Sequence, residues 1–219
     1  MFFSSKLIIV TGHFGSGKTN ISVNIATKYA EAGENVTIVD LDTVNPYFRT
    51  KDAESLMKEK NINVIAPVFA NTNVDIPSIP AEVYSVFPHL KNGGVCIFDV
   101  RGDSLGAAAL GFFNKEITSF GYEMAYVFNM YRPITETPDG AMKILKEIEA
   151  RSRLKCTCCI NNSNLGQFTQ KEDIENSFSY AEEFSHLSGL NIKFTSVMGE
   201  MPICNTEVFT MQNITKKLF

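Results

Sequence analysis

A glycine-rich stretch near the start of the chain contains the residue types that hold a triphosphate. It reads Gly12-His13-Phe14-Gly15-Ser16-Gly17-Lys18-Thr19, a glycine and four residues followed by glycine, lysine and threonine. The glycines let the backbone wrap closely with its N–H groups pointing inward, where they form a nest for anions. A lysine in the place of Lys18 reaches the β- and γ-phosphates, and a hydroxyl in the place of Thr19 ligates Mg²⁺. The stretch predicts a phosphate-binding segment that extends to Asn20; a glycine-rich turn that binds nothing is the alternative.

Two acidic residues end the next apolar run, Val36-Thr37-Ile38-Val39-Asp40-Leu41-Asp42. Carboxylates this close repel each other unless a cation or a water molecule lies between them. Beside a phosphate-binding loop the cation would be Mg²⁺ and the water would be the attacking one, so both aspartates are candidate metal residues. Asp42 and Lys18 are the candidate catalytic residues. A polar strand end in which Asp42 caps a turn is the alternative, and residues 43–49 are interpreted as a switch segment.

A further aspartate ends the run Gly94-Val95-Cys96-Ile97-Phe98-Asp99, which continues Val100-Arg101-Gly102-Asp103. An acidic residue at the end of an apolar strand is typical of a Walker B position, so Asp99 is predicted to hold Mg²⁺ through water. The Asp-x-x-Gly spacing puts the Gly102 N–H where it can sense a γ-phosphate, as switch loops do. No glutamate follows Asp99 directly, which leaves Asp42 or Asp103 to position the water. Arg101 is either a charge-stabilising residue or an exposed arginine.

Asparagines follow a later apolar run and are candidates for base recognition. They are Asn161, Asn162 and Asn164. An amide both donates and accepts hydrogen bonds and can therefore read a base edge, but asparagine also fills turns. The Asn-Lys-x-Asp signature of GTP-binding proteins is missing from this strand end, and Gln170-Lys171-Glu172-Asp173 is a poor echo of it at a helix start. The sequence therefore favours ATP over GTP, with Asn161 and Asn162 as candidate base-binding residues.

Strand-like and helical patterns alternate along the chain, and they must position these residues. The predicted strands are 6–11, 35–40, 62–66, 94–100, 124–129, 156–161 and 192–198. The helical patterns lie near 18–32, 50–60, 80–87, 105–116, 136–150 and 170–188, and Thr135 or Thr137 is expected to cap the fifth of them. This alternation predicts a three-layer α/β/α fold with a mostly parallel central sheet, in one domain over residues 1–219. In such sheets ligands bind beyond the carboxyl ends of the strands, where the candidate residues fall.

Composition and charge exclude several classes of protein. The 219 residues are 44% hydrophobic and 20% charged, which is ordinary for a soluble globular protein. A net charge of −4 without a basic tract argues against nucleic-acid binding. The chain shows no signal-peptide pattern and no apolar run of bilayer length, so a cytoplasmic location is expected.

Two further segments are interpreted from their patterns. Residues 67–80 are interpreted as an irregular connection. Residues 208–219 are expected to form a short amphipathic helix docked on the domain's own core, with contact to a membrane surface as the alternative.

Five cysteines are expected to be reduced thiols in a cytoplasmic protein. They are Cys96, Cys156, Cys158, Cys159 and Cys204. The run Cys156-Thr157-Cys158-Cys159 invites a metal-binding interpretation, but no histidine lies close to it in sequence and it falls in an apolar run. Small buried residues of a central strand are favoured instead. Alternation along a strand would place Cys156 and Cys158 on one face and Cys159 on the other.

Together these motifs resemble the SIMIBI class of P-loop nucleotide-binding proteins, and within it the MinD/ParA and CobQ/CobB type. The resemblance is strong over residues 6–49 and 94–103. After residue 125 it is limited to the general pattern of the elements and carries no specific motif. It implies a parallel sheet, binding of ATP with Mg²⁺, and often a homodimer with nucleotide between the subunits. By resemblance, Gly15, Gly17, Lys18 and Thr19 bind phosphate and Mg²⁺. Asp42 matches the residue that positions water, Asp40 and Asp99 match metal-shell carboxylates, and Asn161 or Asn162 matches the adenine reader.

The second residue of the loop departs from this family pattern. MinD/ParA relatives carry a signature lysine there, which reaches the partner's phosphates across the dimer, and here the residue is His13. Histidine is shorter and mostly neutral at cytoplasmic pH. Either Arg49, Arg101 or Arg132 supplies the charge, or the protein does not dimerise around nucleotide in that way.

The sequence thus predicts a Mg²⁺-dependent ATP-binding protein, a slow ATPase whose nucleotide state is read by a protein partner or by a second copy of the chain. One alternative is an ATP-dependent ligase or kinase that activates a small carboxylate, as the amidoligase and synthetase relatives do, with residues 67–90 lining its site. The other alternative is a nucleotide-binding module that does not hydrolyse, which His13 in the loop keeps open.

Overall fold

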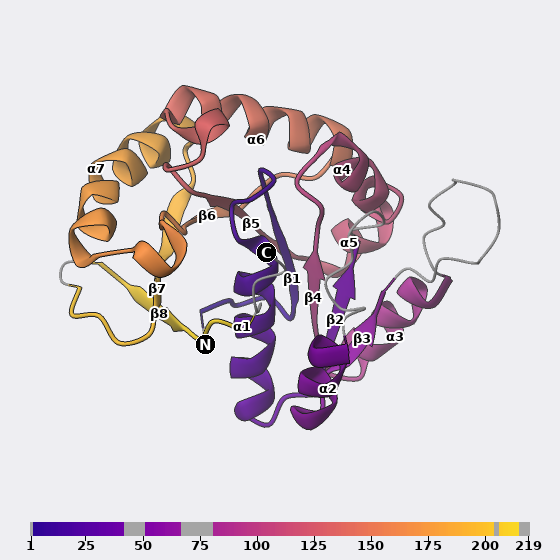
Figure 1. The fold of residues 1–219 in the computed structure, drawn as a ribbon. Coiled ribbons are helices and arrows are strands. Elements are labelled where there is room, and N and C mark those ends of the chain that lie inside the picture. The colour runs from indigo at the N-terminus through magenta and orange to yellow at the C-terminus, as the bar shows by residue number, and fades with distance from the viewer. Residues whose placement is uncertain (1, 42–50, 67–80, 204–205, 215–219) are drawn as a thin grey trace, which may run out of the picture.

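The computed structural model describes residues 2–41, 51–66, 81–203 and 206–214. Eight strands in these ranges form one sheet, all of whose neighbouring strands are parallel, in the order β3-β2-β4-β1-β5-β6-β7-β8 (Figure 1). The strands are β1 (Leu7–Gly12), β2 (Val36–Asp40), β3 (Asn63–Ile65), β4 (Val95–Asp99), β5 (Glu123–Phe128), β6 (Cys158–Asn161), β7 (Asn191–Met198) and β8 (Val208–Met211). The predicted α/β fold with a parallel sheet is confirmed. Asp42, Arg49, the 67–80 connection, Cys204 and residues 215–219 lie outside the described residues.

The helices follow the predicted pattern with two local differences. They are α1 (Lys18–Glu31), α2 (Lys51–Glu59), α3 (Val86–Lys91), α4 (Ser104–Gly111), α5 (Asn114–Phe120), α6 (Pro138–Ser152) and α7 (Lys171–Ser188). The pattern near 105–116 forms two helices, α4 and α5, and the one near 80–87 forms the 3₁₀ turn η2 (Ala81–Ser85) before α3. In the described part of the chain, no helix combines the length and the apolar character needed to cross a membrane.

Side-chain caps fix where the late helices begin. Thr137 precedes α6 and accepts a hydrogen bond from the Gly140 N–H, which confirms one of the two predicted caps. Gln170 and Asp173 form a capping box at the start of α7, with the Gln170 N–H donating to Asp173. The stretch that faintly echoes a GTP signature is therefore a helix cap.

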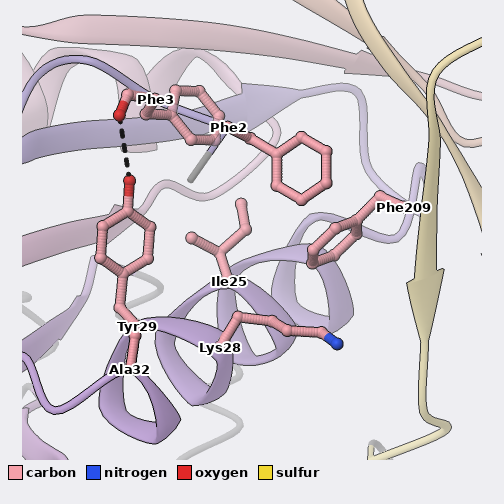
Figure 2. A pocket seen from close by; sticks show the side chains of 7 residues that line it. All are labelled: Phe2, Phe3, Ile25, Lys28, Tyr29, Ala32 and Phe209. Atoms are coloured by element: carbon pink, nitrogen blue, oxygen red, sulfur yellow. Dashed lines mark hydrogen bonds between the residues drawn. The ribbon is translucent and has the colours of Figure 1, made fainter.

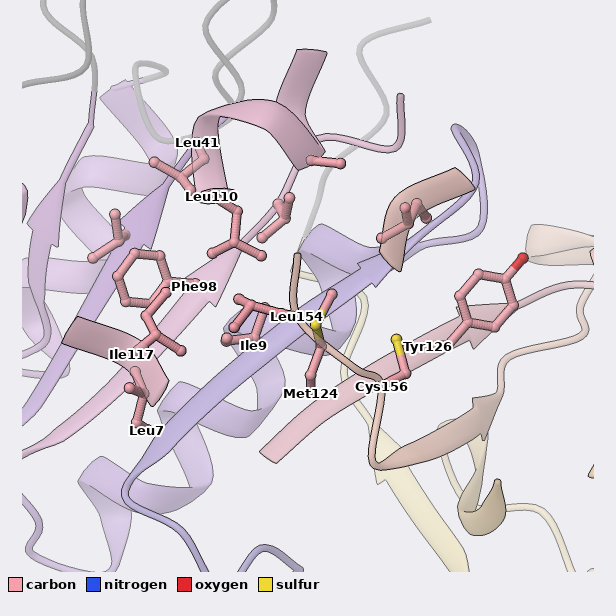
Figure 3. Close-up of a cluster of buried hydrophobic side chains, with 14 of the residues drawn as sticks. Leu7, Ile9, Leu41, Phe98, Leu110, Ile117, Met124, Tyr126, Leu154 and Cys156 are labelled. Atoms are coloured by element: carbon pink, nitrogen blue, oxygen red, sulfur yellow. The ribbon is translucent and has the colours of Figure 1, made fainter. Parts of the chain in front are cut away.

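Two hydrophobic cores lie on the two faces of the sheet. Successive residues of β1 alternate between them, because side chains along a strand point to opposite faces. Leu7 and Ile9 pack in the core covered by α3 to α7, part of which is drawn in Figure 3, and Ile8 and Val10 pack in the core under α1 and α2. Since helices cover both faces, the central strands are continuous apolar runs.

Residues 208–211 form a strand, so the prediction of a helix there is wrong. Phe209 and Met211 are buried and Thr210 is exposed, which is the period of a strand, and the parallel edge of β7 supplies its hydrogen bonds. The chain then docks on α1, because the Gln212 N–H donates to Asn24 Oδ1 at 2.8 Å and the Asn24 amide donates to the Gln212 carbonyl at 3.0 Å. Docking on the domain's own core is confirmed for these residues.

The four cysteines in the described ranges are free and buried. Cys156 and Cys159 belong to one core and Cys158 to the other, so the predicted face of Cys156 is wrong. The reason is that β6 begins at Cys158, and the alternation does not extend back to Cys156. Burial raises the pKa of the Cys158 thiol to about 11 and that of Cys159 to about 12, which disfavours the thiolate form that metals need.

A cavity of about 240 Å³ lies against the later turns of α1 (Figure 2), and none of the residues that line it belongs to the glycine-rich loop. Tyr29 beside it uses its hydroxyl to donate to the Phe3 carbonyl at 3.3 Å. The lining is mostly aromatic and aliphatic: Phe2, Phe3, Ile25, Lys28, Tyr29, Ala32 and Phe209. Such a lining offers few polar partners to a phosphate, so the candidate site must lie elsewhere.

Candidate functional site

The glycine-rich loop joins β1 to α1 at the carboxyl edge of the sheet. Gly12, Gly15 and Gly17 have φ values of +144°, +77° and +88°, a region that side-chain-bearing residues rarely adopt. A Cβ atom on Gly12 would also lie 2.1 Å from the Val127 carbonyl oxygen. The glycines are therefore required by the path of the loop and by its packing on β5.

The inside of the loop presents donors. The Lys18 ammonium donates to the His13 carbonyl at 2.9 Å, and the Ser16 N–H donates to the same oxygen at 3.1 Å. Gly17, which precedes α1, provides no side-chain cap, so the first N–H groups of this helix face the loop. Within the described ranges the buried Ser16 hydroxyl has no hydrogen-bond partner. A bound anion with several acceptor oxygens would satisfy these groups, as the sequence predicts.

His13 does not bring a positive charge to the loop. Burial lowers the pKa of His13 below its usual value and the nearby Lys18 charge lowers it further, although a backbone hydrogen bond with Phe14 acts in the opposite direction. The imidazole is therefore neutral at pH 7. Lys18 is the cation that the loop itself contributes.

Asp40 and Asp99 lie side by side at the ends of β2 and β4, where they are register partners. They are 1% and 4% exposed, and the Ser22 hydroxyl from α1 donates to Asp99 Oδ1 at 3.1 Å. Two neighbouring buried carboxylates favour a cation between or beside them. The sequence predicts that the Thr19 hydroxyl at the start of α1 joins them, and the three would make an all-oxygen set, which suits Mg²⁺ with several retained waters. The described residues include no cluster of three or more His, Cys, Asp or Glu side chains around a metal position.

Gly102 lies directly against the glycine-rich loop. A Cβ atom on Gly102 would come within 2.5 Å of the Phe14 nitrogen and 2.6 Å of the Gly12 carbonyl oxygen. The next residue, Asp103, caps α4 by accepting from the Gly106 N–H at 3.0 Å, and its other oxygen pairs with Arg101 Nε at 2.7 Å. Both Asp103 oxygens are thus bonded within the segment that follows β4. Arg101 is paired in this segment, and 22% of its side chain is exposed.

Arg132 lies at the opposite rim of the loop. A Cβ atom placed on Gly15 would be 3.7 Å from Arg132 Nε. The side chain is exposed and comes from the segment after β5. Three arginines were predicted to supply charge, and the structure describes two of them: Arg132 lies beside Gly15, and Arg101 is paired with Asp103. Arg49 lies outside the described residues.

The predicted base-reading asparagines are hydrogen-bonded within the protein. The Asn161 amide donates to Ser177 Oγ at 2.7 Å, and its oxygen accepts from the Ser163 N–H at 3.1 Å. The Asn162 amide donates to the Ser16 carbonyl at 2.6 Å, and its oxygen accepts from the Ser196 hydroxyl. Asn162 therefore holds the glycine-rich loop in position through this hydrogen bond to Ser16. The sequence did not indicate that role.

A pocket of about 160 Å³ opens beyond the ends of β6 and β7, next to Asn162. Its lining is mostly amide, hydroxyl and thioether side chains, with one glycine and one isoleucine: Asn162, Asn164, Gly166, Gln167, Thr169, Ile174, Ser196, Met198, Met201 and Met211. Sequence reasoning missed Ser196, Met198 and Met201, because no local motif marks them. Ser22 was also missed, although its place one helical turn after Lys18 is a usable signal.

The order of the strands makes the two sides of the candidate site chemically different. β2 and β4 carry the two aspartates on one side of β1 and its loop, while β5, β6 and β7 bring Arg132 and the pocket on the other side. A ligand seated here would have anionic groups on the loop, a metal at one end and a compact organic group at the other. That distribution fits a nucleoside triphosphate.

The comparisons with known proteins agree with this geometry. A family model described as the CobQ/CobB/MinD/ParA nucleotide binding domain matches residues 7–195. No curated protein sequence matches the chain.

Solved structures with a similar fold include FtsY from Mycoplasma mycoides, with a TM-score of 0.61 and 21% identity over 87% of this chain and 59% of that one. Cell division protein FtsY from Thermotoga maritima has a TM-score of 0.59 and 20% identity over 89% of this chain and 62% of that one. The signal recognition particle 54 kDa protein from Aeropyrum pernix K1, in complex with GDP, has a TM-score of 0.55 and 16% identity over 95% of this chain and 42% of that one. The chain therefore spans less than two thirds of these proteins, and the likeness shows the fold alone.

Proposed function

The chain belongs to the CobQ/CobB/MinD/ParA nucleotide-binding domain family, and from that premise we propose that it is a Mg²⁺-dependent ATP-binding protein and slow ATPase whose nucleotide state is read by a protein partner. In this proposal the loop N–H groups and Lys18 hold the phosphates, and Thr19, Asp40 and Asp99 hold Mg²⁺. Asp42 positions the attacking water. Mg²⁺, when bound, would neutralise charge on the β- and γ-phosphates.

The observation that carries the switch role is the contact between Gly102 and the glycine-rich loop. The space beside Gly102 is too small even for a Cβ atom, which would lie 2.5 Å from the Phe14 nitrogen, so a change in the loop on phosphate binding would displace the segment after β4. That segment leads directly into α4, whose Leu105 is 63% exposed. The phosphate site is thereby coupled to the outer surface.

Exposed apolar side chains surround the same edge of the sheet. Phe14 is 71% exposed on the glycine-rich loop itself, and others follow β4, β5 and β6: Leu105, Ile134, Leu165 and Phe168. Single exposed hydrophobic residues are normal, but several on neighbouring loops around one site favour a protein contact there. The partner that reads the nucleotide state is proposed to bind at this edge.

ATP is proposed over GTP because the only echo of the Asn-Lys-x-Asp signature, residues 170–173, forms the cap of α7. Competition of unlabelled ATP and GTP against a fluorescent ADP analogue tests this choice. Stronger competition by GTP would overturn it.

Replacing Asp99 with asparagine is expected to remove most of the gain in ATP affinity that Mg²⁺ provides, roughly tenfold, because the amide carries no charge. The asparagine oxygen can still accept from Ser22, so the fold is retained. Titration calorimetry with Mg²⁺ and with EDTA measures the effect. Asp139→Asn, an exposed change in the first turn of α6, is the matched control. An Asp99→Asn protein with wild-type Mg²⁺ dependence would contradict the assignment.

Replacing Asp42 with alanine is expected to spare ATP binding and to slow hydrolysis roughly tenfold or more, because the water loses its general base or positioning group. The same variant traps the ATP state, so light scattering should show a larger assembly with ATP and Mg²⁺ than with ADP or without nucleotide.

The outcomes separate the proposal from its rivals. Normal hydrolysis by Asp42→Ala would contradict the role of that residue. Equal mass in all three states, with ATP bound, would rule out self-association and leave a different partner protein or the ligase alternative, which a screen of small carboxylates for stimulated ATP consumption tests. No phosphate release by the wild-type protein under any condition, with tight binding retained, would favour the non-hydrolysing module.

A further inference from the structure

We propose that Arg132 binds the α- and β-phosphates of the nucleotide, adding equally to the affinity for ATP and ADP and taking no part in hydrolysis. The inference rests on the proposed function, since it concerns the same site. It assigns a binding role to a residue outside the glycine-rich loop and outside the metal-binding aspartates.

The side chain of Arg132 already lies along the loop. Its Nε and Cδ atoms are 3.7 and 3.9 Å from the Cβ position of Gly15, and both residues are exposed. Within the described ranges no carboxylate forms an ion pair with Arg132. Its guanidinium has five N–H donors in a planar fork that matches phosphate oxygens. The group is therefore available at the rim of the anion-binding loop.

The backbone beneath this side chain is fixed. The Arg132 N–H donates to the Asn129 carbonyl at 3.2 Å, and the Arg132 carbonyl accepts from the Thr135 N–H at 2.9 Å. The buried Thr135 hydroxyl also donates to the Asn129 carbonyl at 2.8 Å, and Tyr180 on α7 donates to the Thr135 carbonyl at 2.7 Å. These bonds fix the position beside the loop from which the Arg132 side chain extends.

The order of the strands decides which phosphates Arg132 can reach. Asp40 and Asp99 end β2 and β4, on one side of β1, and the Mg²⁺ that they would hold would neutralise charge at the γ-phosphate end of the nucleotide. Arg132 follows β5, on the other side of β1, and the pocket beside Asn162 lies further along the sheet, beyond the ends of β6 and β7. The γ-phosphate end thus faces the aspartates, and Arg132 faces the α- and β-phosphates.

The charge of the ligand explains why a second cation is needed. A nucleoside diphosphate already carries several negative charges, and Lys18 is the one lysine or arginine of the loop formed by residues 12–19. Arg101 on the aspartate side is paired with Asp103. Arg132 therefore supplies the charge on the nucleoside side.

The test compares affinities for ATP and ADP, each with Mg²⁺, between the wild-type protein and Arg132→Ala. A charge-assisted hydrogen bond predicts that both affinities fall by roughly the same factor, about tenfold, with kcat at saturating ATP unchanged. Arg132→Lys should lie between the two, because an ammonium keeps the charge and lacks the planar fork. Arg151→Ala, which removes an exposed arginine from the last turn of α6, is the matched control and should bind both nucleotides normally.

Three results would overturn the inference. They are wild-type affinity of Arg132→Ala for both nucleotides, loss of ATP affinity without loss of ADP affinity, and a fall in kcat with ADP affinity unchanged. The last two would place Arg132 at the γ-phosphate. Should Arg132→Ala fail to fold, Arg132→Lys tests the inference through a smaller loss that should again be equal for ATP and ADP. Failure of the proposed function is recognised separately, because Lys18→Ala would then bind nucleotide as well as the wild-type protein does.

Discussion

Replacing Lys18 with alanine is expected to weaken ATP binding by roughly 1,000-fold. The ammonium lies inside the loop, where it donates to the His13 carbonyl at 2.9 Å, and a nucleotide would exchange that carbonyl for phosphate oxygens. Two charge-assisted hydrogen bonds of about 2 kcal/mol each amount to roughly three orders of magnitude in affinity. Titration calorimetry or displacement of a fluorescent ADP analogue measures the change.

The control for this prediction lies on the same helix. Lys28→Ala removes an exposed lysine from the last turn of α1 and should leave ATP affinity unchanged. Thermal unfolding without nucleotide should show Lys28→Ala as stable as the wild-type protein, because Lys28 is exposed, and should show that Lys18→Ala, which loses a buried side chain, is still folded. Nucleotide binding by Lys18→Ala within about threefold of the wild type would contradict the phosphate-binding role of the loop.

Replacing Gly102 with alanine is expected to reduce both stability and nucleotide affinity. The new Cβ would lie 2.5 Å from the Phe14 nitrogen and 2.6 Å from the His13 carbonyl carbon, so two backbone segments must separate. Overpacking of this kind costs about 1–3 kcal/mol of unfolding free energy. Because the displaced segment is the phosphate-binding loop itself, ATP affinity should fall by roughly 30-fold as well. Denaturant unfolding and calorimetry measure the two effects separately.

Gly33→Ala is the control for Gly102→Ala, because it introduces backbone strain without a contact with the loop. Gly33 has a φ of +84° and open space around its Cβ position, so alanine there is strained without touching another residue. It should lose about 1 kcal/mol of stability and keep its ATP affinity. An affinity loss in Gly33→Ala as large as in Gly102→Ala would show that general destabilisation, and not the contact with the loop, weakens binding.

The sequence by itself determined the features whose signals are local. The glycine-rich stretch, the acidic ends of two strands, the alternation of strands and helices and the cap at Thr137 each depend on residues close together in the chain. These features were enough to predict the α/β fold and the family. Local signals also misled where two local patterns compete, because residues 208–211 suit an amphipathic helix and also suit an edge strand. These residues form a strand because the edge of β7 supplies hydrogen-bond partners for their backbone.

Only the tertiary structure decided which distant residues meet. Asp40 stands beside Asp99 because β2 pairs with β4 in that register, and Gly102 touches the loop because β4 is the neighbour of β1. The Asn162 amide donates a hydrogen bond to the Ser16 carbonyl, 146 residues away, and the Arg132 side chain lies beside Gly15. The physical reason is that strand order and register are set by the packing of the whole sheet, which no local pattern encodes. The sequence named three arginines, and the position of β5 next to β1 brings one of them, Arg132, to the loop.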